Sequence, residues 1–100
     1  MKVIVSPAAE AQIDTIDRWW REHRRAAPEL FIQELAASFQ LLAVLPQAGH
    51  VQWHIRPDVR RICLRSSRYH VYYRVRGETL EVVALWSAVR GTGPNLTRLP

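Results

Sequence analysis

The hydrophobic residues of this chain recur with two different periods, one in each half of the sequence. In residues 7–25 and again in residues 31–42 their spacing of three or four is that of one face of an α-helix. The positions are Ala9, Ile13, Ile16 and Trp20, followed by Phe31, Leu35, Phe39 and Leu42. From residue 61 onward apolar and polar residues alternate, which is typical of β-strands. This change of period predicts an α+β fold.

The first half predicts a hairpin of two antiparallel helices. Ser6 and Pro7 are a helix-start signal, with serine as the N-cap and proline at the first helical position. The first helix is expected to end near Arg25, because Pro28 disfavours helical geometry in the residue before it. Pro28 suits the first turn of the second helix, and the Pro-Gln-Ala-Gly segment at residues 46–49 is expected to end it.

The second half predicts an antiparallel meander. Strands are expected at residues 61–66, 69–76 and 79–86, joined by tight turns. A further strand at residues 3–5 precedes the first helix, and residues 53–55 are compatible with a strand or a loop. The helical hairpin is expected to pack on one face of a sheet of about four strands. The residues of the last strand expected to share one face are Leu80, Val82, Ala84 and Trp86.

Length and composition predict a single domain over residues 1–100, with an irregular tail from about residue 91. No apolar stretch approaches the ~20 residues of a membrane span, and the apolar run at the N-terminus is too short for a signal peptide. We therefore expect a cytoplasmic protein that does not contact a membrane. The single cysteine, Cys63, is expected to be a reduced thiol buried at the edge of the core.

The formal net charge is +5, and the whole positive excess lies in residues 51–100, which carry nine arginines against three acidic residues. Thirteen of the fourteen basic residues are arginine. The planar guanidinium group binds carboxylates and phosphates through two hydrogen bonds at once. An acidic protein partner or a nucleic acid is therefore expected.

The polar positions of two neighbouring strands predict a basic surface on the sheet. These positions are Arg61, Cys63, Arg65, His70, Tyr72, Arg74 and Arg76. Cross-strand neighbours lie about 5 Å apart, so these side chains could form one continuous, partly aromatic surface that holds phosphates or an acidic segment. The alternative is a solvated sheet face whose arginines serve solubility.

Other features of the sequence carry less functional information. The four histidines, His23, His50, His54 and His70, are scattered, and neither a metal site nor a cofactor is expected. Trp19 and Trp20 differ by about 100° around the helix axis, so one of them must lie at a boundary of the core. Trp19 is a candidate anchor for a partner, with packing under the loop between the helices as the alternative.

Five short motifs follow one another along the chain. They are Ser-Pro-Ala-Ala at residues 6–9, Leu-Pro-Gln-Ala-Gly at 45–49, Arg-Ile-Cys-Leu at 61–64 leading into Tyr-His-Val-Tyr-Tyr at 69–73, and Leu-Trp-Ser-Ala-Val-Arg-Gly at 85–91. Together with the order of the expected elements, they resemble the RelE/ParE toxins of bacterial type II toxin–antitoxin systems. The resemblance covers residues 2 to about 94 and implies the fold of that superfamily.

The resemblance implies one of two activities. RelE-like toxins cleave messenger RNA on the ribosome with cations on the sheet and a tyrosine or histidine near the C-terminus. In this chain Arg61, Arg65 and Arg90 would stabilise the phosphate and His70 would relay protons. However, Cys63 and His70 stand where cations are usual, and neither tyrosine nor histidine follows Arg90.

ParE-like toxins, known for inhibiting DNA gyrase, have no such catalytic requirement. The Pro-x-x-Gly helix end and the tyrosine-rich strand of this chain resemble those of ParE-like toxins more than those of RelE-like toxins. The resemblance therefore favours a non-enzymatic, ParE-like toxin that binds a target such as gyrase and forms a hetero-oligomer with a cognate antitoxin through an acidic segment. The alternatives are a RelE-like ribonuclease and a non-toxic basic binding domain of the same fold. The residues expected to bind target or antitoxin are Arg61, Arg65, Tyr72, Arg74, Arg76, Arg90 and Trp19.

Overall fold

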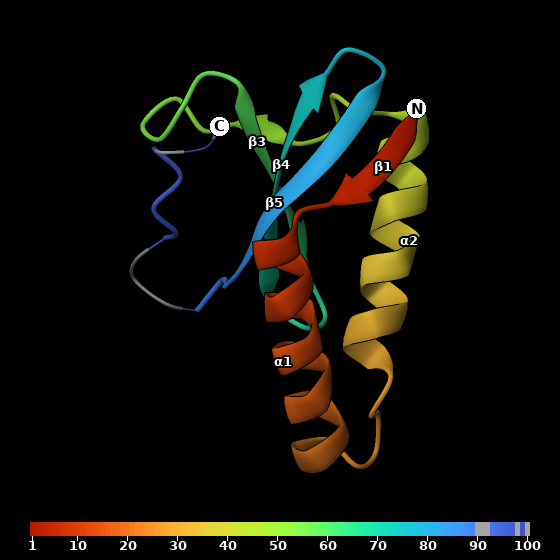
Figure 1. The fold of residues 1–100 in the computed structure, drawn as a ribbon. Helices are drawn as coiled ribbons and strands as arrows, with labels where there is room; N and C mark the ends of the chain where they lie inside the picture. The colour runs from red at the N-terminus through yellow and green to blue at the C-terminus, as the bar shows by residue number, and fades with distance from the viewer. Residues whose placement is uncertain (90–92, 98, 100) are drawn as a thin grey trace.

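The computed structural model describes residues 1–89, 93–97 and 99, and in these residues two helices pack against one face of a five-stranded sheet (Figure 1). The elements are β1 (Lys2–Val5), α1 (Pro7–His23), α2 (Leu30–Val44), β2 (His50–Val51), β3 (Val59–Leu64), β4 (Tyr69–Arg76) and β5 (Thr79–Ser87). The strand order is β1-β5-β4-β3-β2; all neighbours are antiparallel except β1, which is parallel to β5. The predicted α+β fold is confirmed, with a fifth strand added.

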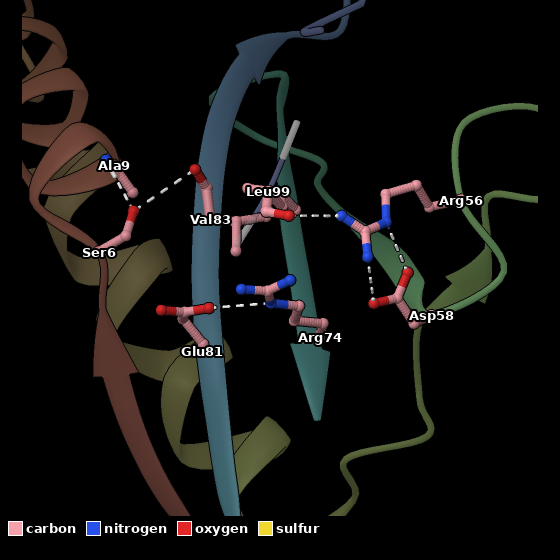
Figure 2. Close-up of polar contacts among 8 residues, drawn as sticks. All are labelled: Ser6, Ala9, Arg56, Asp58, Arg74, Glu81, Val83 and Leu99. Atoms are coloured by element: carbon pink, nitrogen blue, oxygen red, sulfur yellow. Dashed lines mark hydrogen bonds and ion pairs between the residues drawn. The ribbon is translucent and has the colours of Figure 1, made fainter. Parts of the chain in front are cut away.

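The helices begin and end close to the predicted positions. The Ser6 hydroxyl oxygen caps α1 by accepting a hydrogen bond from the Ala9 N–H at 3.2 Å (Figure 2). α1 ends at His23, slightly earlier than expected, and α2 begins at Leu30, slightly later. The reason for the later start is a turn, closed by a hydrogen bond from the Leu30 N–H to the Ala27 carbonyl at 3.2 Å.

The helix-facing side of the sheet carries the larger core. Its fully or nearly buried side chains come from both helices and from β3, β4 and β5: Ala9, Trp20, Phe31, Leu35, Leu42, Leu64, Val71, Tyr73, Leu80, Val82 and Leu85. Of the two adjacent tryptophans, Trp20 lies in this core, while Trp19 is 41% exposed. The sequence-based expectation that one of the pair lies at a boundary is confirmed.

A β-bulge in β5 changes which residues face the helices. The pairing of β5 with β4 shifts midway along the strands and leaves Val83 as an extra residue. After the bulge Leu85 joins the helix-facing core, and Trp86 packs on the opposite face. The prediction that the even-numbered residues 80–86 share one face is therefore wrong beyond the bulge.

The opposite face of the sheet carries a second, smaller core. Buried side chains from β3, β4, β5 and the C-terminal segment form it: Val59, Tyr72, Val83, Ala84 and Leu96, with Ile55, Trp86 and Leu99 partly buried against them. The C-terminal segment thus lies on the side of the sheet away from the helices (Figure 1). Residues 53–55, compatible with a strand or a loop by sequence, belong to the turn-rich segment between β2 and β3.

The segment after α2 is held by the phenol of Tyr73. The Tyr73 O–H donates to the Pro46 carbonyl at 2.8 Å, and the phenol oxygen accepts from the Gly49 N–H at 2.8 Å. A Cβ at position 49 would lie 2.6 Å from that oxygen, so the site requires glycine. Burial raises the pKa of Tyr73, although the Gly49 hydrogen bond and the charge of Arg60 act in the opposite direction. The phenol therefore stays protonated and able to donate.

We predict that Tyr73→Phe lowers the free energy of unfolding by about 1–3 kcal/mol, because the buried Gly49 N–H then loses its acceptor. Urea denaturation followed by circular dichroism measures the change. Tyr69→Phe is the matched control, because the Tyr69 hydroxyl makes no hydrogen bond within the described part of the chain. Equal losses in the two variants would contradict the role assigned to the Tyr73 phenol.

Candidate functional site

The predicted functional residues of β3 and β4 meet on the face of the sheet turned away from the helices. We call this surface the outer face and define it by Arg61, Cys63, His70, Tyr72 and Arg74. Antiparallel register places Cys63 opposite His70 and Arg61 opposite Tyr72. Cross-strand partners share a face, so the alternation in the sequence brings these side chains together as expected.

The centre of the outer face is not open to solvent. Tyr72 and Arg74 are each only 2% exposed. The Arg74 guanidinium donates to the carboxylate of Glu81 across the β4–β5 pair at 2.9 Å (Figure 2). The expectation of one continuous basic surface is therefore wrong at these two positions, and their roles in binding a partner stay predictions.

Residues from two loops cover that centre. Leu96 and Leu99 of the C-terminal segment pack with the second core. Arg56 donates to both carboxylate oxygens of Asp58, at 3.0 and 3.1 Å, and to the Leu99 carbonyl at 3.1 Å (Figure 2). These contacts tie the C-terminal segment to the loop before β3. Alternation along β4 alone does not reveal this cover, because it comes from residues distant in the sequence.

Arg61 and His70 form the accessible polar part of the outer face. Both side chains are partly buried. Burial lowers the pKa of His70, and the positive charge of Arg61 lowers it further. The imidazole is therefore uncharged at neutral pH, where it can accept a proton more readily than it can donate one.

His50 is an outer-face residue that sequence reasoning did not select. β2 places His50 directly opposite Arg61, so an imidazole lies next to Arg61 on the side away from β4. β2 is only two residues long, too short for a periodicity. The pairing of Gly49 with Tyr73 is what positions this segment.

Cys63 is exposed, which corrects the expectation of a buried thiol. Its neighbours Ile62 and Leu64 face the helices, so the alternation of β3 turns Cys63 outward. The apolar character of the surrounding run belongs to the other face of the strand.

The remaining predicted cations are dispersed. Arg65 follows the end of β3 and Arg76 lies at the end of β4, and both are exposed. Arg90 lies outside the described residues. The binding and catalytic roles assigned to these three arginines stay predictions.

A second surface feature is a groove of about 540 Å³ between α1 and the end of β5. Thr15 and Trp19 of α1 line one wall, and Tyr69, Leu85 and Trp86 of the sheet line the other. The structure thus places Trp19, a predicted anchor for a partner, on the wall of a groove. The alternative for Trp19, packing under the loop between the helices, does not fit a side chain that is 41% exposed.

The Trp19 ring is held in place by its helix. His23 stacks on it with ring centroids 4.8 Å apart and planes 13° apart. The guanidinium carbon of Arg24 lies 5.6 Å from the ring centroids of both Trp19 and Trp20. An exposed aromatic ring fixed in this way loses little conformational entropy on binding.

Sequence reasoning missed the groove, although one signal for it exists. The first strand stops at Ser6 after four residues, while the last strand runs for nine. If the two pair, the longer strand must extend beyond its neighbour. That inference requires the parallel pairing of β1 with β5, which the sequence did not reveal.

Comparison with known families identifies the chain. Residues 3–90 match the sequence profile described as ParE toxin of type II toxin-antitoxin system, parDE. The chain belongs to the ParE toxin family. A comparison with curated proteins returned no match. Family membership makes the protein a toxin of a type II toxin–antitoxin system, and this class implies an antitoxin partner.

Two further observations describe this ParE-family toxin. In the described parts of the chain, neither helix combines the length and apolar character needed to cross a membrane. The same residues contain no group of three or more histidine, cysteine, aspartate or glutamate side chains placed to hold a metal ion.

We predict that the His70 imidazole of this ParE-family toxin titrates below the ordinary pKa of 6.5. In Arg61→Gln the pKa of His70 rises but does not reach the ordinary value, because burial is the larger cause. Two-dimensional NMR of the histidine rings as a function of pH measures both values. The pKa of His70 is lower in the folded state than in the unfolded chain, so the unfolded chain takes up a proton first as the pH falls. The free energy of unfolding therefore decreases as the pH falls below about 6.5. A normal pKa in the folded toxin would contradict the structure.

We predict that Cys63 reacts fully with a chromogenic disulfide reagent in the native toxin, without denaturant, because its side chain is exposed. The released chromophore reports the number of reactive thiols, and Cys63→Ser provides the blank. If modification required unfolding, the outward orientation of Cys63 would be wrong.

Proposed function

We propose that this toxin stops growth by binding a macromolecular target, and that the target is DNA gyrase, as the resemblance to ParE-like toxins implies. The observation that carries the proposal is the dispersal of positive charge on and around the outer face. Arg74 is buried in an ion pair with Glu81, while Arg65 and Arg76 lie near opposite ends of the paired strands. Among the described cations, Arg61 is the one whose positive charge lowers the pKa of His70.

This dispersal favours binding over phosphate cleavage. The transition state of phosphodiester cleavage carries charge on several oxygens of one phosphorus, and preorganised donors must converge on it. Scattered exposed arginines suit a broad acidic surface instead, where each charge makes a separate contact. We therefore infer an inhibitor without catalytic activity, and the sequence-based expectation places it in the cytoplasm.

A cognate antitoxin is proposed to neutralise the toxin through an acidic segment. The chain has a formal charge of +5, and Arg61 and Arg65 are accessible on the surface that the target would use. A segment that folds on binding can wrap a large surface and be removed by proteolysis when its partner is absent. Charge complementarity would speed the association.

A ribonuclease is the second candidate, and one observation favours it. β2 and β4 place His50 and His70 on the outer face, His50 directly opposite Arg61 and His70 close enough for the charge of Arg61 to lower its pKa. Two imidazoles beside a guanidinium could supply a base, an acid and phosphate stabilisation. This arrangement predicts that the histidines are essential.

Expression in a bacterial host separates the candidates. We predict that the wild-type toxin causes growth arrest that co-expression of the adjacent antitoxin gene relieves. The double variant His50→Ala/His70→Ala remains toxic, and Arg61→Ala loses at least about tenfold in affinity for gyrase. Lys2→Ala, an exposed cation on β1, is the control for Arg61.

The readouts are supercoiling by purified gyrase with added toxin, and cleavage of a reporter mRNA during translation. Inhibited supercoiling with intact mRNA supports the proposal. Loss of toxicity and of mRNA cleavage in the double histidine variant would establish the ribonuclease instead. Normal growth with folded wild-type toxin present would show a binding domain that is not toxic.

A further inference from the structure

Among the residues that the structure describes, no strand lies beside one edge of β5 along its second half. β1 pairs with β5 from Lys2 opposite Thr79 to Val5 opposite Val82, and then the chain turns into α1. β5 continues to Ser87, and β4 occupies only its other edge. From Val83 onward the second edge therefore faces α1 across the groove of about 540 Å³.

Side chains of α1 and its cap take the place of a neighbouring strand at this edge. The side-chain carbonyl of Gln12 accepts a hydrogen bond from the Leu85 N–H at 2.8 Å. The Ser6 hydroxyl makes a long contact of 3.5 Å with the Val83 carbonyl (Figure 2). A primary amide has the same donor and acceptor groups as a peptide bond. Gln12 thus marks a position where a peptide could bind.

The hydrogen bond between Leu85 and Gln12 shows which backbone groups of β5 point toward the groove. N–H and C=O groups alternate between the two edges of a strand. Because the Leu85 N–H points into the groove, the N–H and C=O of Ser87 point there too, while Trp86 bonds toward β4. The hydrogen bond from the Ala88 N–H to the Arg68 carbonyl at 2.8 Å agrees with that alternation.

The walls of the groove suit side chains of an extended segment. Ala11 and Thr15 are small and exposed, so the α1 wall leaves space above β5. Trp19 lines the groove on the helix side, and Trp86, which packs on the opposite face of the sheet, lines it from the outer side, so each can contact an apolar side chain of an added strand. The open edge spans about five residues, or about 17 Å of extended chain.

We propose that this groove binds an extended segment of the antitoxin, which adds to β5 as a strand in the place that β1 leaves vacant. The proposal rests on the proposed function, because it takes an antitoxin as the partner. A helix satisfies its own backbone groups and could not use the open edge of β5. A strand replaces the Gln12 side chain as the partner of the Leu85 N–H, bonds the backbone groups of Ser87, and alternates its side chains between the α1 side and the outer side of the sheet.

Charge at the aromatic end of the groove defines the partner further. Arg24 packs over Trp19, and Arg68 lies beside Ala88 at the end of β5. Both arginines are exposed. The segment therefore carries an apolar or aromatic residue next to Trp19 and acidic residues beside it, where they meet these guanidinium groups.

Binding of the purified, full-length antitoxin encoded beside the toxin gene tests the proposal. Ala11→Trp fills the groove and weakens binding at least about tenfold, and Trp19→Ala does the same by removing a wall. Ala37→Trp adds the same bulk at an exposed alanine of α2 and changes affinity less than about threefold. Thermal unfolding verifies that each variant is folded.

Hydrogen exchange of the wild-type complex tests the strand directly and needs no variant. The Ser87 amide exchanges at least about tenfold more slowly with antitoxin bound, because it becomes a donor to the added strand. An unchanged Ser87 amide together with weaker binding of Ala11→Trp would indicate a helix in the groove and overturn the proposal. Equal binding by wild-type and Ala11→Trp toxin overturns it as well.

Two outcomes separate this inference from the proposed function. If the wild-type toxin binds the antitoxin but the groove variants bind equally, the groove inference fails and neutralisation by antitoxin stands. If the wild-type toxin does not bind the antitoxin, the proposed function itself fails. A toxin dimer that Ala11→Trp dissociates would identify a second copy as the occupant, which also overturns the proposal.

Discussion

Ser6 and Pro7 end β1 after four residues, and the arrangement of the other elements depends on this early stop. Pro7 has no N–H to donate and the Ser6 side chain caps a helix, so the chain leaves the sheet level with Val82 of β5. α1 then runs along the remainder of β5 (Figure 1). A longer β1 would have covered that edge and left no groove.

The far side of the sheet shows why a count of arginines does not describe a binding surface. Arg74 carries one of the charges that make this chain basic, yet it lies beneath the C-terminal segment and is neutralised by Glu81. Burying an unpaired guanidinium would be costly, so the ion pair accompanies the cover. What remains accessible is the group around Arg61, flanked by histidines on β2 and β4.

The two surface features favour binding partners of different chemistry. The group around Arg61 presents positive charge beside two imidazole rings, which favours an acidic target or partner. The groove presents backbone groups and tryptophan rings, which favour a peptide of defined side-chain pattern. An antitoxin that contacted both would gain affinity from the two sites acting together. Family membership supplies the biological class, and the geometry supplies the chemistry of recognition.

The sequence alone determined the element types, because helical and strand periods, the Ser-Pro start and the Pro-x-x-Gly end are local signals. It also determined which β3 and β4 residues share a face, since alternation is a property of each strand. Only the tertiary structure decided the partners of β1 and β2, the bulge at Val83, the cover over Arg74 and the groove beside Trp19. These features depend on contacts between residues far apart in the chain. A local sequence pattern does not show which distant residues will meet or how much free energy their contact contributes.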